Sequence, residues 1–106
     1  MRESDLVGDI IRALYPTVQL ERHNVGVFNT PDGRRVSAGP PKGYPDLSGH
    51  RLGDGKAVYI EVKIGDGEPS DEQLAYLCRM AAGGAVAVIC WSVEDALALV
   101  GRCERG

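Results

Sequence analysis

Three residues whose types and spacing could do chemistry lie in GYPDLSGHRLGDGKAVYIEVK, which spans residues 43–63. Side chains alternate between the two faces of a strand, so Glu61 and Lys63 should point the same way, with Cα atoms roughly 7 Å apart. The LGDG sequence is a turn signal and predicts a hairpin. With the turn centred on its two middle residues, Asp46 lies opposite Glu61 on the neighbouring strand.

This pairing of carboxylates predicts a metal site. Like charges on directly opposed strand positions repel, and a divalent cation removes the repulsion because Mg²⁺ prefers hard oxygen ligands. A metal held by Asp46 and Glu61 would acidify a bound water, and Lys63 could orient that water or stabilise charge on a phosphate. The alternatives are a solvated strand face with a weak ion pair, and a turn aspartate after proline.

Two further polar residues are expected near this pair. Glu3 should project near the inward stripe of the first helix. Gln73 lies in the first turn of the capped helix, just after the loop that leaves the Glu61–Lys63 strand. In strand–helix units, sites gather at the carboxyl ends of strands. The alternative for Gln73 is a role only in the S-x-x-Q capping box that begins at Ser70. The alternative for Glu3 is a plain first-turn carboxylate.

Hydrophobic periodicity and turn signals predict the elements that must position these residues. In the first half of the chain we expect a helix over Asp5–Tyr15 capped by Ser4, a strand over Glu21–Asn29 and a Gly/Pro-rich loop over residues 30–42. Two hairpin strands around LGDG should follow, and then a helix that begins after Ser70, has an apolar stripe of Leu74, Leu77, Cys78 and Ala81, and ends at Gly83–Gly84. The last elements should be a buried strand over Ala85–Cys90 and a short helix capped by Ser92. The strand–helix–strand unit should be a right-handed parallel crossover. The expected fold is α/β, one domain over residues 1–106, with a small mixed sheet flanked by helices.

Composition narrows the class of protein. The net charge is −3, so a nucleic-acid partner would have to be held by a local patch. No apolar run is long enough to span a bilayer and no signal segment is evident, which predicts a cytoplasmic protein without a membrane partner. The three cysteines have no metal-binding spacing; Cys78 and Cys90 are expected in the core, and Cys103 near the end. His23 and His50 fit no zinc-ligand spacing.

GYPD, followed by fourteen residues and then EVK, resembles the PD-(D/E)xK signature of the restriction-endonuclease-like nucleases. Five features together resemble the VRR-NUC (virus-type replication-repair nuclease) family: the helix with Glu3, GYPDL, YIEVK, the S-x-x-Q helix ending in GG, and a strand followed by S-x-E-D. The resemblance runs from Glu3 to about Val100. One departure is Cys90-Trp91 at the end of the last strand, where many relatives have an arginine.

The resemblance implies a restriction-endonuclease-like α-β-β-β-α-β core with a short C-terminal helix, and a Mg²⁺- or Mn²⁺-dependent endodeoxyribonuclease. It implies Asp46, Glu61 and the backbone carbonyl of Val62 as metal ligands and Glu3 as an outer ligand. Lys63 would be the catalytic lysine and Gln73 a supporting residue. Stand-alone, phage-type members look like homodimers that cut branched DNA such as Holliday junctions or flaps, which implies DNA repair in a bacterial or phage-infected cell.

Several residues are candidate DNA contacts. Arg22, Arg34, Arg35 and Lys42 could bind phosphates, and Tyr44 could stack on a base or sugar. The alternatives are a solvated loop with scattered charge and a tyrosine packed beneath the hairpin. Two other functions stay open at this stage: a non-catalytic nucleic-acid-binding module on the same fold, and a protein–protein adaptor.

Overall fold

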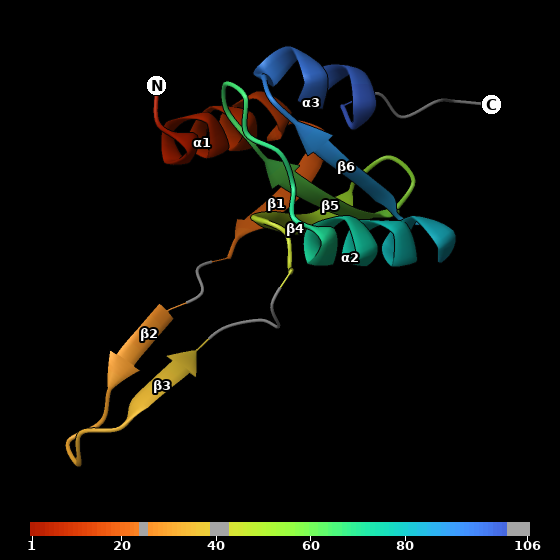
Figure 1. Ribbon diagram of the computed structural model, residues 1–106. Helices are drawn as coiled ribbons and strands as arrows, with labels where there is room; N and C mark the ends of the chain where they lie inside the picture. The colour runs from red at the N-terminus through yellow and green to blue at the C-terminus, as the bar shows by residue number, and fades with distance from the viewer. Residues whose placement is uncertain (24–25, 39–42, 102–106) are drawn as a thin grey trace.

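The computed structural model describes residues 1–23, 26–38 and 43–101, without the side chains of residues 26–29 and 35–38 (Figure 1). It is an α/β structure with a four-stranded mixed sheet, a separate two-stranded ribbon and three helices in the described residues. The elements in chain order are α1 (Glu3–Leu14), β1 (Val18–Arg22), β2 (Gly26–Asn29), β3 (Arg35–Ala38), β4 (Leu47–Arg51), β5 (Ala57–Val62), α2 (Asp71–Ala82), β6 (Val86–Cys90) and α3 (Val93–Leu99). None of the described helices has the length and apolar character needed to cross a membrane.

The large sheet has the strand order β1-β4-β5-β6. Its first three strands are antiparallel, whereas β6 runs parallel to β5 after the crossover through α2, as predicted. α1 and α3 pack together on one face of the sheet, and α2 covers the other face (Figure 1). The core lies under α1 and α3, where Ile10, Leu14, Val58, Ile60 and Val62 are fully buried.

The β4–β5 hairpin has the register that the sequence predicts. Leu47 pairs with Ile60 and His50 with Ala57, so Asp46 lies one step beyond, opposite Glu61. At the turn, the Arg51 guanidinium binds both carboxylate oxygens of Asp54, at 2.6–3.2 Å, and donates to the Val100 carbonyl at 3.2 Å. The hydrogen bonds from Arg51 lower the pKa of Asp54 to about 2. This fork fixes the end of the hairpin that is remote from Glu61.

The first helix begins two residues earlier than predicted, and Ser4 is not its cap. Glu3 already opens the helix, and Arg2 is the capping residue, whose backbone N–H donates to Asp5 Oδ2 at 3.1 Å. The Asp5 carboxylate thus accepts the backbone N–H of the capping residue, as the N3 residue of a capping box does. Glu3 therefore lies in the first turn of α1.

The segment between residues 18 and 42 also differs from prediction. The expected single strand over Glu21–Asn29 is two strands, β1 and β2, and the expected loop over residues 30–42 contains β3, which pairs with β2. The turn between β2 and β3 is closed by Thr30 N–H donating to the Arg34 carbonyl at 2.8 Å. Gly33 has a φ of +86°, which suits glycine in a tight hairpin turn.

The predicted burial of α2 and β6 is wrong in part. Of the apolar stripe on α2 only Leu77 is buried, whereas Leu74 is 41% exposed and Cys78 is exposed rather than in the core. In β6, Cys90 alone is fully buried, because this strand forms an edge of the sheet. The predicted caps at Ser70 and Ser92 are confirmed, and Cys103 lies outside the described residues.

Alanine substitutions at two glycines should change the stability of the protein in opposite directions. A Cβ at Gly49 would lie 1.7 Å from the Gln19 carbonyl oxygen on the neighbouring strand, whereas a Cβ at Gly8 would meet only the ends of arginine side chains at 3.5 Å or more. Gly49→Ala should lower the free energy of unfolding by at least about 3 kcal/mol, because β1 must move. Gly8→Ala should raise it by roughly 0.5–1 kcal/mol through helix propensity. Urea denaturation measures both, and a stable Gly49→Ala protein would contradict the close strand approach.

Candidate metal centre

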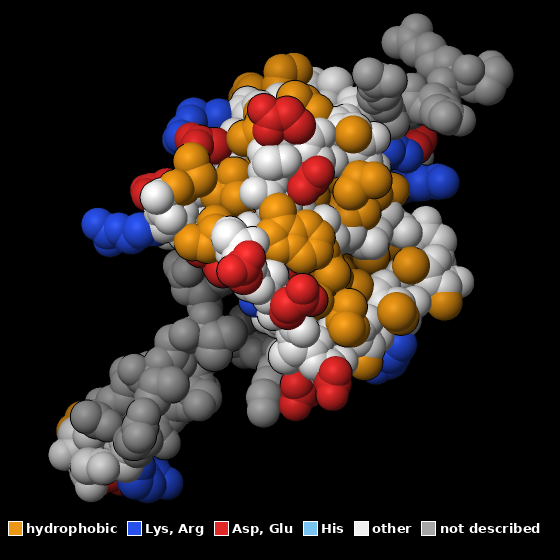
Figure 2. All heavy atoms as spheres, turned by 45° about the horizontal axis from the view of Figure 1, so that its top comes forward, with side chains coloured by type: hydrophobic (Ala, Val, Ile, Leu, Met, Phe, Trp, Pro, Cys, Tyr) orange, Lys and Arg blue, Asp and Glu red, His pale blue; other side chains and the backbone are white. Residues whose placement is uncertain are grey.

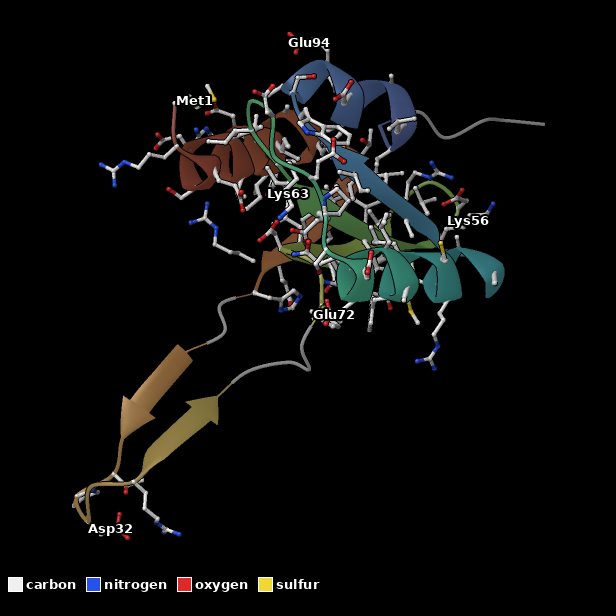
Figure 3. The ribbon with its side chains drawn as sticks, viewed as in Figure 1. Met1, Asp32, Lys56, Lys63, Glu72 and Glu94 are labelled. Carbon is white, nitrogen blue, oxygen red and sulfur yellow. The ribbon has the colours of Figure 1, made fainter. Side chains whose placement is uncertain are left out.

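Three carboxylates converge at one end of the large sheet. Glu61 lies at the carboxyl end of β5, Asp46 directly precedes β4, and Glu3 opens α1. One carboxylate oxygen from each lies within 4.8 Å of the other two. The structure therefore brings together Asp46 and Glu61, the pair predicted from the hairpin register, and adds Glu3, the residue expected at the edge of the site. Lys63 lies in the same region, between α1 and α2 (Figure 3).

The backbone fixes Asp46. Its Oδ2 accepts a hydrogen bond from Val62 N–H at 2.8 Å, and its carbonyl accepts one from His23 N–H at 2.9 Å. The preceding turn needs Gly43, whose φ is +87° and whose Cβ would come within 2.8 Å of the Glu72 carbonyl oxygen on α2. The GYPD segment is therefore docked against the first turn of α2.

Glu61 is buried, with a side chain that is 2% exposed. Its Oε2 accepts from Gln73 Nε2 at 3.0 Å and lies 3.3 Å from Lys63 Nζ. Its Oε1 is also buried but has no hydrogen-bond partner among the described residues. Burial, and then the neighbouring Asp46 carboxylate, raise the pKa of Glu61 to about 7, although Lys63 lowers it. The predicted common face of Glu61 and Lys63 is confirmed.

Gln73 has both of the roles that the sequence left open. Its Oε1 accepts from Ser70 N–H at 2.8 Å and its backbone N–H donates to Ser70 Oγ at 3.1 Å, which completes the capping box of α2. Its Nε2 is then directed at Glu61. Because one amide group serves the helix and the carboxylate together, the start of α2 and the centre are held in one geometry.

A cavity of about 130 Å³ opens beside the carboxylates, lined by Glu3, Ser4, Val7, Arg22, His23 and Asp46. Arg22 Nη2 donates to the Ser4 carbonyl at 3.1 Å, so this predicted DNA contact lies next to the centre. His23 Nε2 is hydrogen-bonded to Ser48 Oγ at 2.5 Å. Sequence reasoning assigned no role to His23, because its spacing fits no ligand pattern. Its position directly after β1, at the same end of the sheet as Asp46 and Glu61, is the feature that identifies His23 as a residue of this cavity.

Of the other predicted contacts, Tyr44 lies beside the cavity, whereas Arg34 lies far from it. Tyr44 packs edge-on against His23, Tyr59 and Tyr76, with ring centroids 4.8, 6.4 and 5.1 Å away, which matches the packing alternative. Arg34 is exposed in the turn between β2 and β3, beside Asp32 at the far end of the ribbon from Lys63 (Figure 3). The side chain of Arg35 and the whole of Lys42 lie outside the described residues.

The donor set suits a hard divalent cation. All three converging side chains offer carboxylate oxygens, which Mg²⁺ and Mn²⁺ accept and which thiol-seeking metals do not prefer. The buried, unpartnered Oε1 of Glu61 supplies an oxygen that a cation would satisfy. The Val62 carbonyl is a further donor, because N–H and C=O of one strand residue face the same edge and Val62 N–H faces Asp46.

No protein-family model matches this chain, and a search of curated proteins gave no match either. The assignment of the centre accordingly depends on its geometry and chemistry. The observations that support it are the three convergent carboxylates, the adjacent lysine and the buried oxygen without a hydrogen bond.

The raised pKa of Glu61 predicts an unusual pH dependence of stability. Its ordinary value is 4.5 and the folded value is about 7, so between these pH values the folded protein binds the extra proton. Stability without metal should therefore fall as the pH rises from about 4.5 through 7, by up to roughly 3 kcal/mol. Urea denaturation in a chelator at pH 5 and pH 8 measures the change. Glu61→Gln should lose this slope, whereas Glu94→Gln, an exposed control on α3, should keep it; equal slopes in all three would show that Glu61 titrates normally.

Proposed function

We propose that this protein is a Mg²⁺- or Mn²⁺-dependent endonuclease that hydrolyses phosphodiester bonds in DNA, on a restriction-endonuclease-like core of the VRR-NUC type. The observation that carries the proposal is the buried Glu61, which has an unsatisfied oxygen, faces two other carboxylates and has an ammonium group 3.3 Å away. Carboxylates at this spacing repel unless a cation joins them. An ammonium beside a metal-binding carboxylate is suited to phosphate chemistry.

Each residue has a distinct part in this proposal. Asp46, Glu61 and the Val62 carbonyl would hold the cation, with Glu3 at its outer side. When bound, the cation supplies Lewis-acid activation of water and neutralises phosphate charge. Lys63 orients the attacking water or binds a phosphate oxygen, because its Nζ is tethered next to Glu61. Gln73 holds the Glu61 carboxylate in place.

The proposed substrate is branched DNA, such as a four-way junction or a flap, and the proposed assembly is a homodimer with two centres. Two-fold assembly would present two cleavage sites to a symmetric substrate. The competing function is a non-catalytic nucleic-acid-binding module. The buried acidic centre favours the enzyme, because three carboxylates repel phosphate and contribute nothing to binding without a cation.

The nuclease proposal predicts metal-dependent cleavage that two substitutions abolish. Labelled junction, flap and linear DNAs incubated with Mn²⁺ should be cut by the native protein and not in a chelator. Lys63→Ala and Glu61→Gln should lower the cleavage rate by at least about 100-fold, because the first removes the ammonium group at the phosphate and the second removes the charge of a proposed metal ligand. Glu94→Gln on α3 should cut normally.

Two measurements separate the proposal from its rival. Asp46→Asn should weaken Mn²⁺ binding measured by calorimetry, while the Glu94→Gln control binds as the native protein does. A shift of DNA mobility without cleavage, unchanged by Glu61→Gln, would instead favour the binding module. Unchanged Mn²⁺ affinity in Asp46→Asn would remove Asp46 from the ligand set.

Two substitutions of Gln73 separate its role in capping α2 from its hydrogen bond to Glu61. In Gln73→Glu, the carboxylate can still accept from Ser70 N–H, but it no longer donates to Glu61 and adds a like charge. Cleavage should fall roughly 10- to 100-fold while the capping of α2 is retained. Gln73→Ala should lose about 1 kcal/mol of stability as well. Cleavage rates and thermal melts of the two variants, compared side by side, test this; full activity in Gln73→Glu would show that the residue only caps the helix.

A further inference from the structure

We propose that the β2–β3 ribbon, residues 26–38 and here named the arm, lies in a groove of the duplex that flanks the cleaved phosphate. This inference rests on the proposed function, because it assigns a DNA contact to a segment beside the proposed centre. The arm was expected to be a loop, and its strand pairing is a structural finding. If the arm lies in this groove, the affinity for DNA should depend on the length of the flanking duplex.

The arm is inserted between two elements of the centre. β1 ends at Arg22 and His23, which line the cavity beside the carboxylates, and the chain returns to the sheet at Tyr44 and Asp46. Its two strands pack on each other, and no other described helix or strand packs extensively against them. Figure 1 shows the arm extending away from the sheet, and the molecule measures 56 × 32 × 25 Å. A phosphate held at the centre would therefore lie next to Arg22 and His23, the last described residues before the arm in the sequence.

The shape of the arm suits a nucleic-acid groove. A two-stranded antiparallel ribbon is one of the two elements that the major groove of B-DNA admits, being about 12 Å wide. The four residues of each arm strand span about 13 Å at roughly 3.3 Å per residue, so the ribbon can follow a groove over several base pairs. An isolated two-stranded ribbon is only marginally stable in water. A bound partner would supply the support that the other described helices and strands do not.

The charge of the arm differs in sign from the charge of the rest of the chain, which favours a polyanion as its partner. The arm, residues 26–38, contains two basic residues and one acidic residue, Asp32, a net charge of +1. Because the whole chain carries −3, the remainder carries −4. Figure 2 shows Asp and Glu side chains over the middle of the presented face of the rest of the molecule, here named the body, with Lys or Arg side chains at its margins and a basic side chain at the tip of the arm. Arg34 is 78% exposed in the described turn of the arm, beside Asp32. A polyanion is attracted to the basic arm and repelled by the net negative charge of the rest of the chain.

The test compares two exposed, ion-paired arginines. Arg34 pairs with Asp32 in the arm, and Arg12 pairs with Asp9 on α1 with a side chain that is 73% exposed. Arg34→Glu should raise KM, and Kd for metal-free duplex binding, by roughly three- to tenfold, with kcat unchanged and the salt slope of binding reduced by about one. Arg12→Glu makes the same change in net charge and should behave as the native protein.

A second measurement uses the substrate. Trimming the flanking duplex to less than about one helical turn, about 10 bp, should weaken native binding to the level of Arg34→Glu and should not weaken that variant further. Equal KM and Kd in the native protein and both variants, or indifference of the native protein to flank length, would overturn the inference. So would a change in sedimentation without a change in DNA affinity, which would assign the arm to self-association.

Binding and cleavage distinguish this inference from the proposed function. Flank-dependent DNA binding without cleavage in any divalent metal would leave the arm assigned and reject the nuclease. Cleavage that ignores Arg34 and flank length would keep the nuclease and reject the arm as a groove contact. No DNA binding even at low salt would reject both, since phosphate contacts are strongest there.

Discussion

The buried carboxylate of Glu61 is the constraint on which the rest of this structure depends. A charge withdrawn from water is costly unless donors or a counter-ion compensate it, and Asp46 alongside adds repulsion. Lys63 and Gln73 compensate one of its two oxygens, and the other is left without a hydrogen bond among the described residues. A fold selected for stability alone would not keep such a group, because a buried hydrophobic residue of similar size is usually at least as stable. The protein therefore bears a cost at the position where a cation would remove it.

The elements that carry the centre are tied together by contacts that also stabilise the fold. Gln73 completes the cap of α2 through one atom of its amide and holds Glu61 through the other. Gly43 lets the GYPD turn approach the backbone of α2, and the turn delivers Asp46 to the Val62 N–H. Because the same contacts cap the helix and orient the carboxylates, α2 cannot move without displacing the centre. Such sharing holds the carboxylates within a narrow range of positions, which is what a preorganised site needs.

The sequence was sufficient to predict that Asp46 and Glu61 converge, but not everything around them. The Asp46–Glu61 pairing could be predicted because strand periodicity is exactly two residues and the LGDG turn sets the register. The arm was missed because Pro31, Gly33 and the flanking prolines are typical of loops, whereas strand pairing depends on a partner that local sequence does not reveal. The partial exposure of most of β6 was missed for a related reason: apolar content does not distinguish a central strand from an edge strand. The place of His23 in the cavity could not be predicted, because it depends on the packing of the end of β1 beside Asp46.

On the proposed function, the distribution of charge separates two contributions to DNA affinity. Three carboxylates at the centre repel the phosphate that must enter it, so this part of the affinity depends on a bound cation. By linkage, DNA must then raise the affinity for the cation by the same factor. The arm carries its positive charge outside the acidic body, so its contribution needs no cation and falls only with salt. On this proposal a protein with a net charge of −3 would associate with DNA through the arm first, and the residues of the centre would bind the scissile phosphate only when they also hold the metal.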